Sequence, residues 1–149
     1  MKFCKAIFSF MVGCIIVFMT FGRALNLPTQ NNQKPPIKIG LLISNKNQTE
    51  ARNGAELAVK EFNESGGFQG RKIELITRSM EGPWGTGTKQ TVNLVFNEKV
   101  WAILGSHDGR NAHLVEQVIA KTHIPFVSAW SADPTLAQAY VPWFFNVVP

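Results

Sequence analysis

The sequence predicts an α/β fold built on a doubly wound parallel sheet. Five short apolar runs, each bounded by turn residues, are typical of strands buried inside such a sheet. Most of the segments between them carry the 3.6-residue apolar period of helices. A polar or small-residue loop follows each of the first four runs. Connections from strand through helix to strand are nearly always right-handed parallel crossovers, so the repetition predicts one parallel sheet with helices on its faces.

The first strand and helix come directly after a proline. Residues 37–43, IKIGLLI, are expected to form a buried strand. Thr49 stands where a side chain caps the next helix, and Gly54 lies in the second turn, where it costs stability unless the helix packs close to the sheet. A Ser-Gly-Gly stretch at residues 65–67 is expected to end this helix through a left-handed cap. The apolar face of the helix is expected to comprise Ala51, Ala55, Ala58, Val59 and Phe62.

A second strand and a long glycine-rich loop follow. Residues 72–77, KIELIT, are expected to form the strand, and residues 78–88, RSMEGPWGTGT, the loop. Val92, Val95 and Phe96 have helical spacing. They predict a helix that leads into the next strand.

Residues 100–134 form the central unit of the chain. The apolar run 100–104 is followed by a polar loop and by an amphipathic segment, 111–121. A second apolar run, 124–127, then precedes a small-residue loop, 128–133. In open α/β sheets ligands bind outside the carboxyl ends of the strands, and both loops are expected to lie there.

The last part of the chain is expected to add a fifth strand. Residues 135–139 predict a short helical turn, and residues 143–148, WFFNVV, predict the strand. We expect Trp101 to be a core residue of its strand. Trp84 is expected to anchor its glycine-rich loop, with stacking on a flat or sugar-like ligand as the alternative.

The N-terminus has the pattern of a secretory signal peptide. Lys2 and Lys5 form a basic start, residues 6–22 are an apolar stretch, and Gly-Arg-Ala at 22–24 is a small-x-small cleavage site. The protein is therefore expected to be periplasmic or secreted. An uncleaved N-terminal membrane anchor is the alternative, because 17 apolar residues are at the short end of a membrane span. We expect three regions: a signal peptide at 1–24, a disordered polar lead-in at 25–36 and one folded domain at 37–149.

Cysteine content and charge exclude several kinds of function. Cys4 and Cys14 both lie in the predicted leader, so the mature chain is expected to have no disulfide, cysteine nucleophile or cysteine metal ligand. Loss of the leader also removes Lys2, Lys5 and Arg23, which lowers the formal net charge from +5 to +2. The basic balance belongs largely to the leader and gives no indication of nucleic-acid binding.

Five stretches of the chain carry a family resemblance: IKIGLL, NGAELAVKEFNESGGFQGRKIELITR, VWAILGS, HIPFVSAWSADPTL and VPWFFNVVP. They run from Ile37 to Pro149 and resemble the type I periplasmic binding proteins of the branched-chain amino-acid receptor group. The most specific part is NGAELAVKEFNESGGFQGRKIEL, where helix, Gly-Gly stop, glycine turn and second strand come at the family's spacing. Members have two α/β lobes joined by hinge strands, with the ligand closed between them. The resemblance implies that this sequence is an N-terminal fragment, covering most of the first lobe.

The resemblance also implies a function without chemistry. An extracytoplasmic solute-binding protein of an ABC transporter holds a small polar, amino-acid-like ligand between its lobes and delivers it to an ABC permease in the membrane. No cofactor, metal or nucleic acid is expected as a partner. The alternative is a ligand-sensing extracytoplasmic domain of a signalling receptor, followed by a transmembrane helix. A third, weaker interpretation is a small flavodoxin-like enzyme that ends at Pro149. Repressors of the same fold are disfavoured, because a leader stands where their DNA-binding helices would be.

The resemblance also selects candidate ligand-binding residues. In the family, the loops after the third and fourth strands hold the ligand's polar head, often an amino-acid carboxylate, through N–H groups, hydroxyls and a helix N-terminus. A gapless alignment places the family's contacts on residues without a side-chain hydroxyl, and polar residues stand beside them. The ligand-binding set is therefore Ser106, Asp108, Gly109, Arg110, Trp130, Ser131 and Ala132.

Two of these residues have a specific expected role. Arg110 is suited to pair with a ligand carboxylate, and Trp130 to stack on a flat ligand. The alternative is that Arg110 and Asp108 only neutralise one another at a helix start. The first loop is also shorter than in the family, and SMEGPWGTG replaces acidic residues after the second strand. These departures put an aliphatic amino acid in doubt as the ligand.

Enzyme and metal sites are not predicted. The glycine-rich stretch GPWGTGTK lacks the Gly-Lys-Ser/Thr of a phosphate loop, and Ser106 has no Gly-x-Ser-x-Gly elbow around it. His113 is expected on a helix, with His123 at its far end and His107 near the opposite edge of the sheet. These three histidines cannot converge on a zinc ion, so neither catalytic nor metal-binding residues are assigned.

The apolar last strand predicts behaviour in solution. Residues 143–148 would form an exposed apolar edge if residues 25–149 were prepared alone. We expect that preparation to be poorly soluble and to bind ligand negligibly.

Overall fold

A computed structural model describes residues 34–105, 108–129 and 131–147, and these residues form an α/β fold around one sheet. The strands lie in the order β2-β1-β3-β4-β5, and every neighbouring pair is parallel. The prediction of a parallel α/β sheet is confirmed. Their bounds are β1 (Ile37–Ile43), β2 (Ile73–Ser79), β3 (Ala102–Leu104), β4 (Phe126–Ser128) and β5 (Phe144–Asn146).

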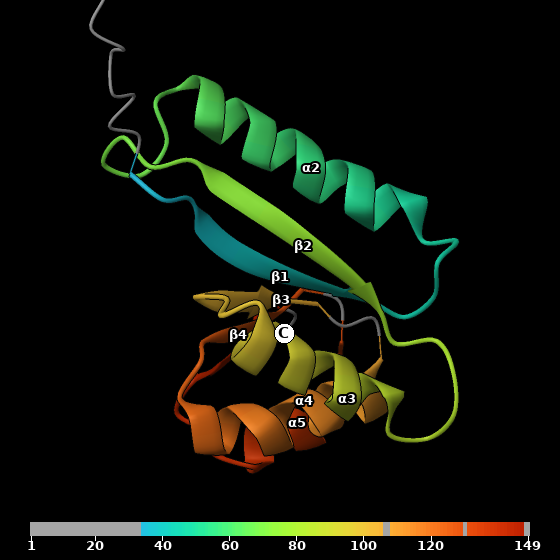
Figure 1. Cartoon of the computed structure of the whole chain (residues 1–149). Helices are drawn as coiled ribbons and strands as arrows, with labels where there is room; N and C mark the ends of the chain where they lie inside the picture. Colours follow the sequence, from blue (N-terminus) through green and yellow to red (C-terminus); the bar gives the residue numbers. More distant parts are fainter. Residues whose placement is uncertain (1–33, 106–107, 130, 148–149) are drawn as a thin grey trace, which may run out of the picture. The chain divides into compact units, whose positions relative to one another are not determined.

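Helices cover both faces of the sheet, as a doubly wound fold requires. One face carries α2 (Thr49–Glu64), which packs on β2 and β1. The other face carries α3 (Thr86–Val92), the π-helix η1 (Asn93–Asn97), α4 (Gly109–Thr122) and α5 (Thr135–Gln138). Figure 1 shows α2 on one side of the strands and α3, α4 and α5 together on the other.

The main core lies between the sheet and the face that carries α3, η1 and α4. Gly40 and Leu42 of β1 point toward it, and a Cβ added at Gly40 would lie 2.8 Å from a methyl carbon of Leu94. Glycine at this strand position therefore lets η1 approach β1 closely. The fully buried members of this core include Leu42, Leu94, Ile103, Val115, Ile119, Phe126 and Leu136.

The helix α2 lies loosely on its face of the sheet, since none of its residues is buried. Two residues of its predicted apolar face are exposed, namely Ala58 and Phe62. Nothing lies within 4 Å of a Cβ added at Gly54, so close packing does not explain that glycine. The expected cap is also wrong: Thr49 is the first helical residue, and the N-cap Gln48 instead accepts a 2.9 Å bond from the Ser44 N–H.

The helix after β2 begins earlier than predicted. It begins at Thr86, inside the predicted loop, and its buried residues are Gly87 and Thr91, followed by Leu94 of η1. These three have the helical spacing i, i+4 and i+7, and Val92 and Phe96 lie off that face and are exposed, whereas Val95 packs partly against the core. The π-helix η1 then closes an i→i+5 bond from the Glu98 N–H to the Asn93 carbonyl at 3.1 Å.

The prediction that Trp101 is a core residue is wrong, since Trp101 is 54% exposed. It stands just before β3, and the guanidinium carbon of Arg71 lies 4.7 Å from its ring centroid. The buried position at this strand is taken by Val100 instead. The predicted leader and most of the lead-in lie outside the described residues.

Candidate ligand-binding site

The order of the strands creates a crevice between β1 and β3. These two strands are neighbours, but the helix that follows β1 lies on one face and the helix that follows β3 lies on the other (Figure 1). The chain therefore diverges at their carboxyl ends. In open α/β sheets ligands bind at such a switch point.

A polar pocket of about 270 Å³ lies at this edge, on the side of α3 and α4. It is formed by the residue after β1, the loop after β2 and the first turns of α4. Both signs of charge are present, so the pocket suits a small polar molecule rather than an apolar one. Its polar and aromatic lining includes Ser44, Glu81, Trp84, Thr86, Asp108, Arg110 and Asn111.

Two of the predicted site residues, Asp108 and Arg110, meet in this pocket. Asp108 is the N-cap of α4, and its carboxylate accepts 2.8 Å bonds from both the backbone and the side-chain amide of Asn111. The guanidinium carbon of Arg110 lies 5.8 Å from the ring centroid of Trp84. Trp84 is 75% exposed, so the expectation of a packed loop anchor is wrong, and the indole forms a surface at the pocket.

Gly109 provides space for a side chain from another loop. A Cβ added there would overlap the carboxylate of Asp133 and lie 2.6 Å from the Asp133 Cβ. The Asp133 Oδ1 accepts bonds from the Thr135 N–H at 2.9 Å and from the Thr135 hydroxyl at 2.6 Å. These two bonds hold the pKa of Asp133 below its usual range. An ionised carboxylate therefore lies directly against the first turn of α4.

The remaining predicted residues either belong to the loop after β4 or lie outside the residues that the structure describes. Ser131 is buried, and among the described residues its hydroxyl has no hydrogen-bond partner. Ala132 is exposed. Ser106 and Trp130 lie outside the described residues. The contact between Gly109 and Asp133 brings the two predicted loops together at this edge.

Most residues that line the pocket were not among the predicted set, and three of the polar ones are Ser44, Glu81 and Asn111. Ser44 follows β1 directly, Glu81 follows β2 by two residues, and Asn111 lies in the first turn of α4. All three stand just beyond the carboxyl end of a strand or at the start of the following helix. That position alone is the signal that identifies them from sequence.

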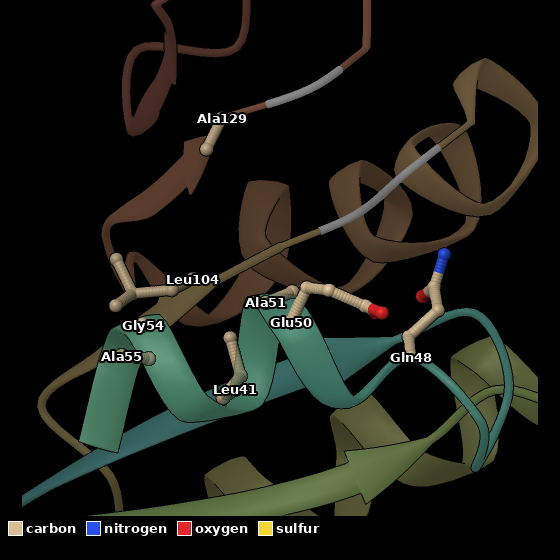
Figure 2. Close-up of a pocket in the computed structure, with 8 residues that line it drawn as sticks. All are labelled: Leu41, Gln48, Glu50, Ala51, Gly54, Ala55, Leu104 and Ala129. Atoms are coloured by element: carbon tan, nitrogen blue, oxygen red, sulfur yellow. The ribbon is translucent and has the colours of Figure 1, made fainter. Parts of the chain in front are cut away.

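An apolar pocket of about 580 Å³ lies on the opposite face, beside α2. Leu41, Leu104 and Ala129 contribute from the strands, and small residues of α2 form the other wall. Figure 2 shows the polar ends of Gln48 and Glu50 at one end of this pocket, away from the leucines. Apolar walls with a polar mouth suit a hydrocarbon group whose polar end remains in water.

A chain of hydrogen bonds joins α4 to the loop before α5. Nδ1 of His113 lies 2.8 Å from Glu116 Oε2, and its Nε2 lies 2.8 Å from the Thr135 hydroxyl. Glu116 is only 3% exposed, and burial raises the pKa of its carboxyl group. The hydrogen bond from His113 acts in the opposite direction on that pKa.

Within residues 34–105, 108–129 and 131–147, no group of three or more His, Cys, Asp or Glu side chains is placed to hold a metal ion. His113 lies in α4 and His123 is its C-cap, while His107 lies outside the described residues. Within the same ranges, every helix is too short or too polar to cross a bilayer.

Comparison with known proteins gives one family and a set of similar structures. A sequence model of the family described as periplasmic binding protein matches residues 36–149. The chain is 26% identical to the branched-chain amino acid transporter substrate binding protein LivJ from Streptococcus pneumoniae, solved in complex with isoleucine. That match has a TM-score of 0.69 and covers 74% of this chain and 33% of LivJ.

Two further structures show the same fold. An ABC transporter substrate-binding protein from Desulfitobacterium hafniense is 25% identical, with a TM-score of 0.71 over 78% of this chain and 34% of that chain. A solute binding protein of an ABC transporter from Rhodopseudomonas palustris, in complex with 3,4-dihydroxy benzoic acid, is 18% identical and similar in fold. Its TM-score is 0.62 over 74% of this chain and 31% of that chain. The chain thus spans about a third of the length of these relatives.

Proposed function

The chain belongs to the periplasmic binding protein family, and from this we propose that it acts as an extracytoplasmic solute-binding protein of an ABC transporter. The ligand would be a small polar molecule with a carboxylate, closed between this lobe and a second lobe of the native protein. Its partner would be an ABC permease in the membrane, and the protein would perform no chemistry. We also propose a signal peptide at 1–24 ahead of a domain at 37–149, which places the protein in the periplasm or outside the cell.

The polar pocket at the switch point carries this proposal. Arg110 presents a guanidinium over the exposed ring of Trp84, beside the N-terminus of α4. A guanidinium pairs bidentately with a carboxylate, and an exposed indole accepts a flat group. The named ligands of two similar proteins, isoleucine and 3,4-dihydroxy benzoic acid, differ in shape but share a carboxyl group. A carboxylate is therefore the chemistry that this pocket is proposed to bind.

The proposal is tested by calorimetric titration of the native protein, isolated with its natural ends. The probes are L-isoleucine and 3,4-dihydroxybenzoate, titrated separately. We expect saturable binding of one of them, weakened roughly tenfold or more by Arg110→Gln, because a charge-assisted hydrogen bond is lost. The matched control is Arg71→Gln, since Arg71 also lies over a tryptophan, at 4.7 Å from the ring of Trp101, outside the pocket.

The control separates a ligand contact from a general effect of losing a stacked arginine. Equal weakening by both substitutions would contradict a role for Arg110 in binding. Absence of saturable binding for both acids would contradict the proposed ligand chemistry. The intact mass of the native protein in the envelope fraction tests the leader separately, because cleavage after residue 24 removes a defined mass.

A further inference from the structure

The two loops of the site are tied together by the side chain of His113. It projects from α4, whose N-terminus carries Asp108, and reaches Thr135 at the start of α5. Thr135 in turn holds Asp133, the residue that lies against Gly109. The bonds of this imidazole ring therefore add to the contact between Gly109 and Asp133 in positioning the loop at residues 131–135 relative to α4.

The proton positions in this chain of bonds follow from donor and acceptor rules. Asp133 is ionised, so the single hydroxyl proton of Thr135 is donated to its Oδ1 at 2.6 Å. The Thr135 oxygen must then accept from His113, which requires a proton on Nε2. The 2.8 Å contact between Nδ1 and Glu116 Oε2 needs a further proton, carried by either the ring or the carboxyl group.

Burial makes that second proton essential. Glu116 is 3% exposed, and its other oxygen, Oε1, is buried without a hydrogen-bond partner among the described residues. Desolvation raises the pKa of Glu116, so its protonated form is favoured at low pH. The stability that this proton gives to the folded chain is lost as pH rises through the raised pKa. Without the shared proton, either Oε2 faces a ring nitrogen lone pair, or the ring carries its one proton on Nδ1 and the Thr135 hydroxyl leaves Asp133 to donate to Nε2. In both cases the chain loses one hydrogen bond.

Few other charges act on this pair. The groups that influence Glu116 are His113 and Asp133. The strand β4 and the helix α5 carry no titratable side chain in their sequences, FVS and TLAQ. The remaining charged residues on α4 and on the neighbouring α3 are Arg110, Lys121 and Lys89, all of them cations. None of these cations can supply the proton that Nδ1 and Oε2 share.

We propose that His113 and Glu116 are positioning residues that form a one-proton latch between α4 and the loop at residues 131–135. With the shared proton present, the ring holds Thr135, and the loop is fixed against the first turn of α4. When the proton is lost, the chain from Glu116 to Asp133 has one hydrogen bond fewer, and the loop is held less firmly against α4. The effect of the latch on ligand binding rests on the function proposed above, whereas the latch itself does not.

The latch is tested by hydrogen exchange of the native protein without ligand, followed by mass spectrometry on peptides that cover residues 133–140. Measurements run from pH 5 to pH 8, above the usual range of a carboxyl group, because burial raises the pKa of Glu116, and they are corrected for intrinsic exchange rates. We expect protection of this segment to fall roughly tenfold across the range, because a charge-assisted bond is lost.

Two substitutions are expected to act in opposite directions. His113→Ala removes the link and should give low protection at every pH. Glu116→Gln replaces the carboxyl by an amide that always has a proton to donate to Nδ1, so protection should stay high at every pH. The matched control is His123→Ala at the other end of α4, which should keep the pH dependence of the wild-type protein.

The outcomes are decisive without any ligand. A flat profile in the wild-type protein, or a wild-type fall in the Glu116→Gln variant, would overturn the latch. Should His113→Ala fail to fold, the Glu116→Gln profile still decides between the two cases. Failure of both acids to bind in the titration leaves this test unchanged. A flat exchange profile likewise leaves the binding result unchanged.

Discussion

At the scale of single residues, two helical glycines have opposite surroundings. Gly109 opens α4 with the Asp133 side chain where its Cβ would be, whereas nothing lies within 4 Å of a Cβ added at Gly54 in α2. The first glycine allows two loops to meet. The second lines the apolar pocket beside α2 and adds conformational freedom to the unfolded chain.

This contrast predicts opposite effects of the same substitution. Gly109→Ala should lower the free energy of unfolding by about 1–3 kcal/mol, because Asp133 must leave its bonds to Thr135. Gly54→Ala should raise it by about 0.5–1 kcal/mol, as expected for an exposed helical position. Urea unfolding of both variants measures the difference. Equal stabilities of the Gly109→Ala variant and the wild-type protein would mean that Asp133 moves without cost.

Residue-scale prediction from sequence placed Asp108 at a helix start, and the structure has it as the N-cap of α4. The one cap that was named from sequence, Thr49, was wrong. Trp101 was misplaced, because its partner Arg71 is thirty positions away and belongs to a turn. The pocket residues Ser44 and Glu81 were missed for the same reason: they meet Arg110 only through the strand order.

At the scale of elements, η1 sets the contact between the second crossover and the sheet. Its fully buried Leu94 lies over Gly40 of β1, where an added Cβ would be 2.8 Å from a leucine methyl. The buried residues Thr91 and Leu94 lie on one side of this helix, and the apolar Val92 and Phe96 are exposed. Apolar spacing therefore predicted that a helix exists here but gave no indication that the polar Thr91 is buried.

The contact between Gly40 and Leu94 predicts strong coupling in a double-mutant cycle. Leu94→Ala should cost about 2–5 kcal/mol through a cavity, and Gly40→Ala about 1–3 kcal/mol through overpacking. In the double variant the new methyl group at position 40 enters the space left by the leucine. The loss of unfolding free energy in the double variant should thus be smaller than the sum of the two single losses, by about 0.5–3 kcal/mol.

Denaturant unfolding of the four proteins gives the coupling energy. Strict additivity would contradict the close approach of η1 to β1.

The strands were predicted more accurately than the helix after β2. The apolar runs located all five strands, and only their bounds differed, by a few residues. A short strand ends where the neighbouring strand offers no further backbone hydrogen-bond partner. The residues of that neighbouring strand lie far away in the sequence, so the sequence does not show where the pairing stops.

At the scale of the whole molecule, the sequence predicted the fold and the family, because motif spacing extends over the entire domain. The ligand could not be predicted in the same way. Two of the seven candidate residues, Gly109 and Ala132, have no polar group on the side chain, and the pocket that forms uses residues from three separate loops. The chain also spans about a third of the length of these relatives.

One row of apolar side chains on the sheet is only partly covered by a helix. The register places Phe145 in one row with Leu41 and Leu104, on the face that carries α2. Because α2 packs on β1 and β2, the far end of that row is uncovered: Phe145 is 52% exposed and Val147 is 63% exposed. Adjacent apolar side chains at a sheet edge promote association with other chains.

We therefore expect residues 25–149, prepared alone, to self-associate through this face. Replacing both side chains in a Phe145→Ser, Val147→Thr variant should shift the association toward monomer by roughly tenfold or more in dissociation constant, because each buried apolar side chain contributes about 1.5–3 kcal/mol. Sedimentation velocity measures the shift. Tyr140→Ser is the matched control, since Tyr140 is 87% exposed but lies between α5 and β5, outside the sheet. A monomeric wild-type preparation would show that the uncovered row does not drive association.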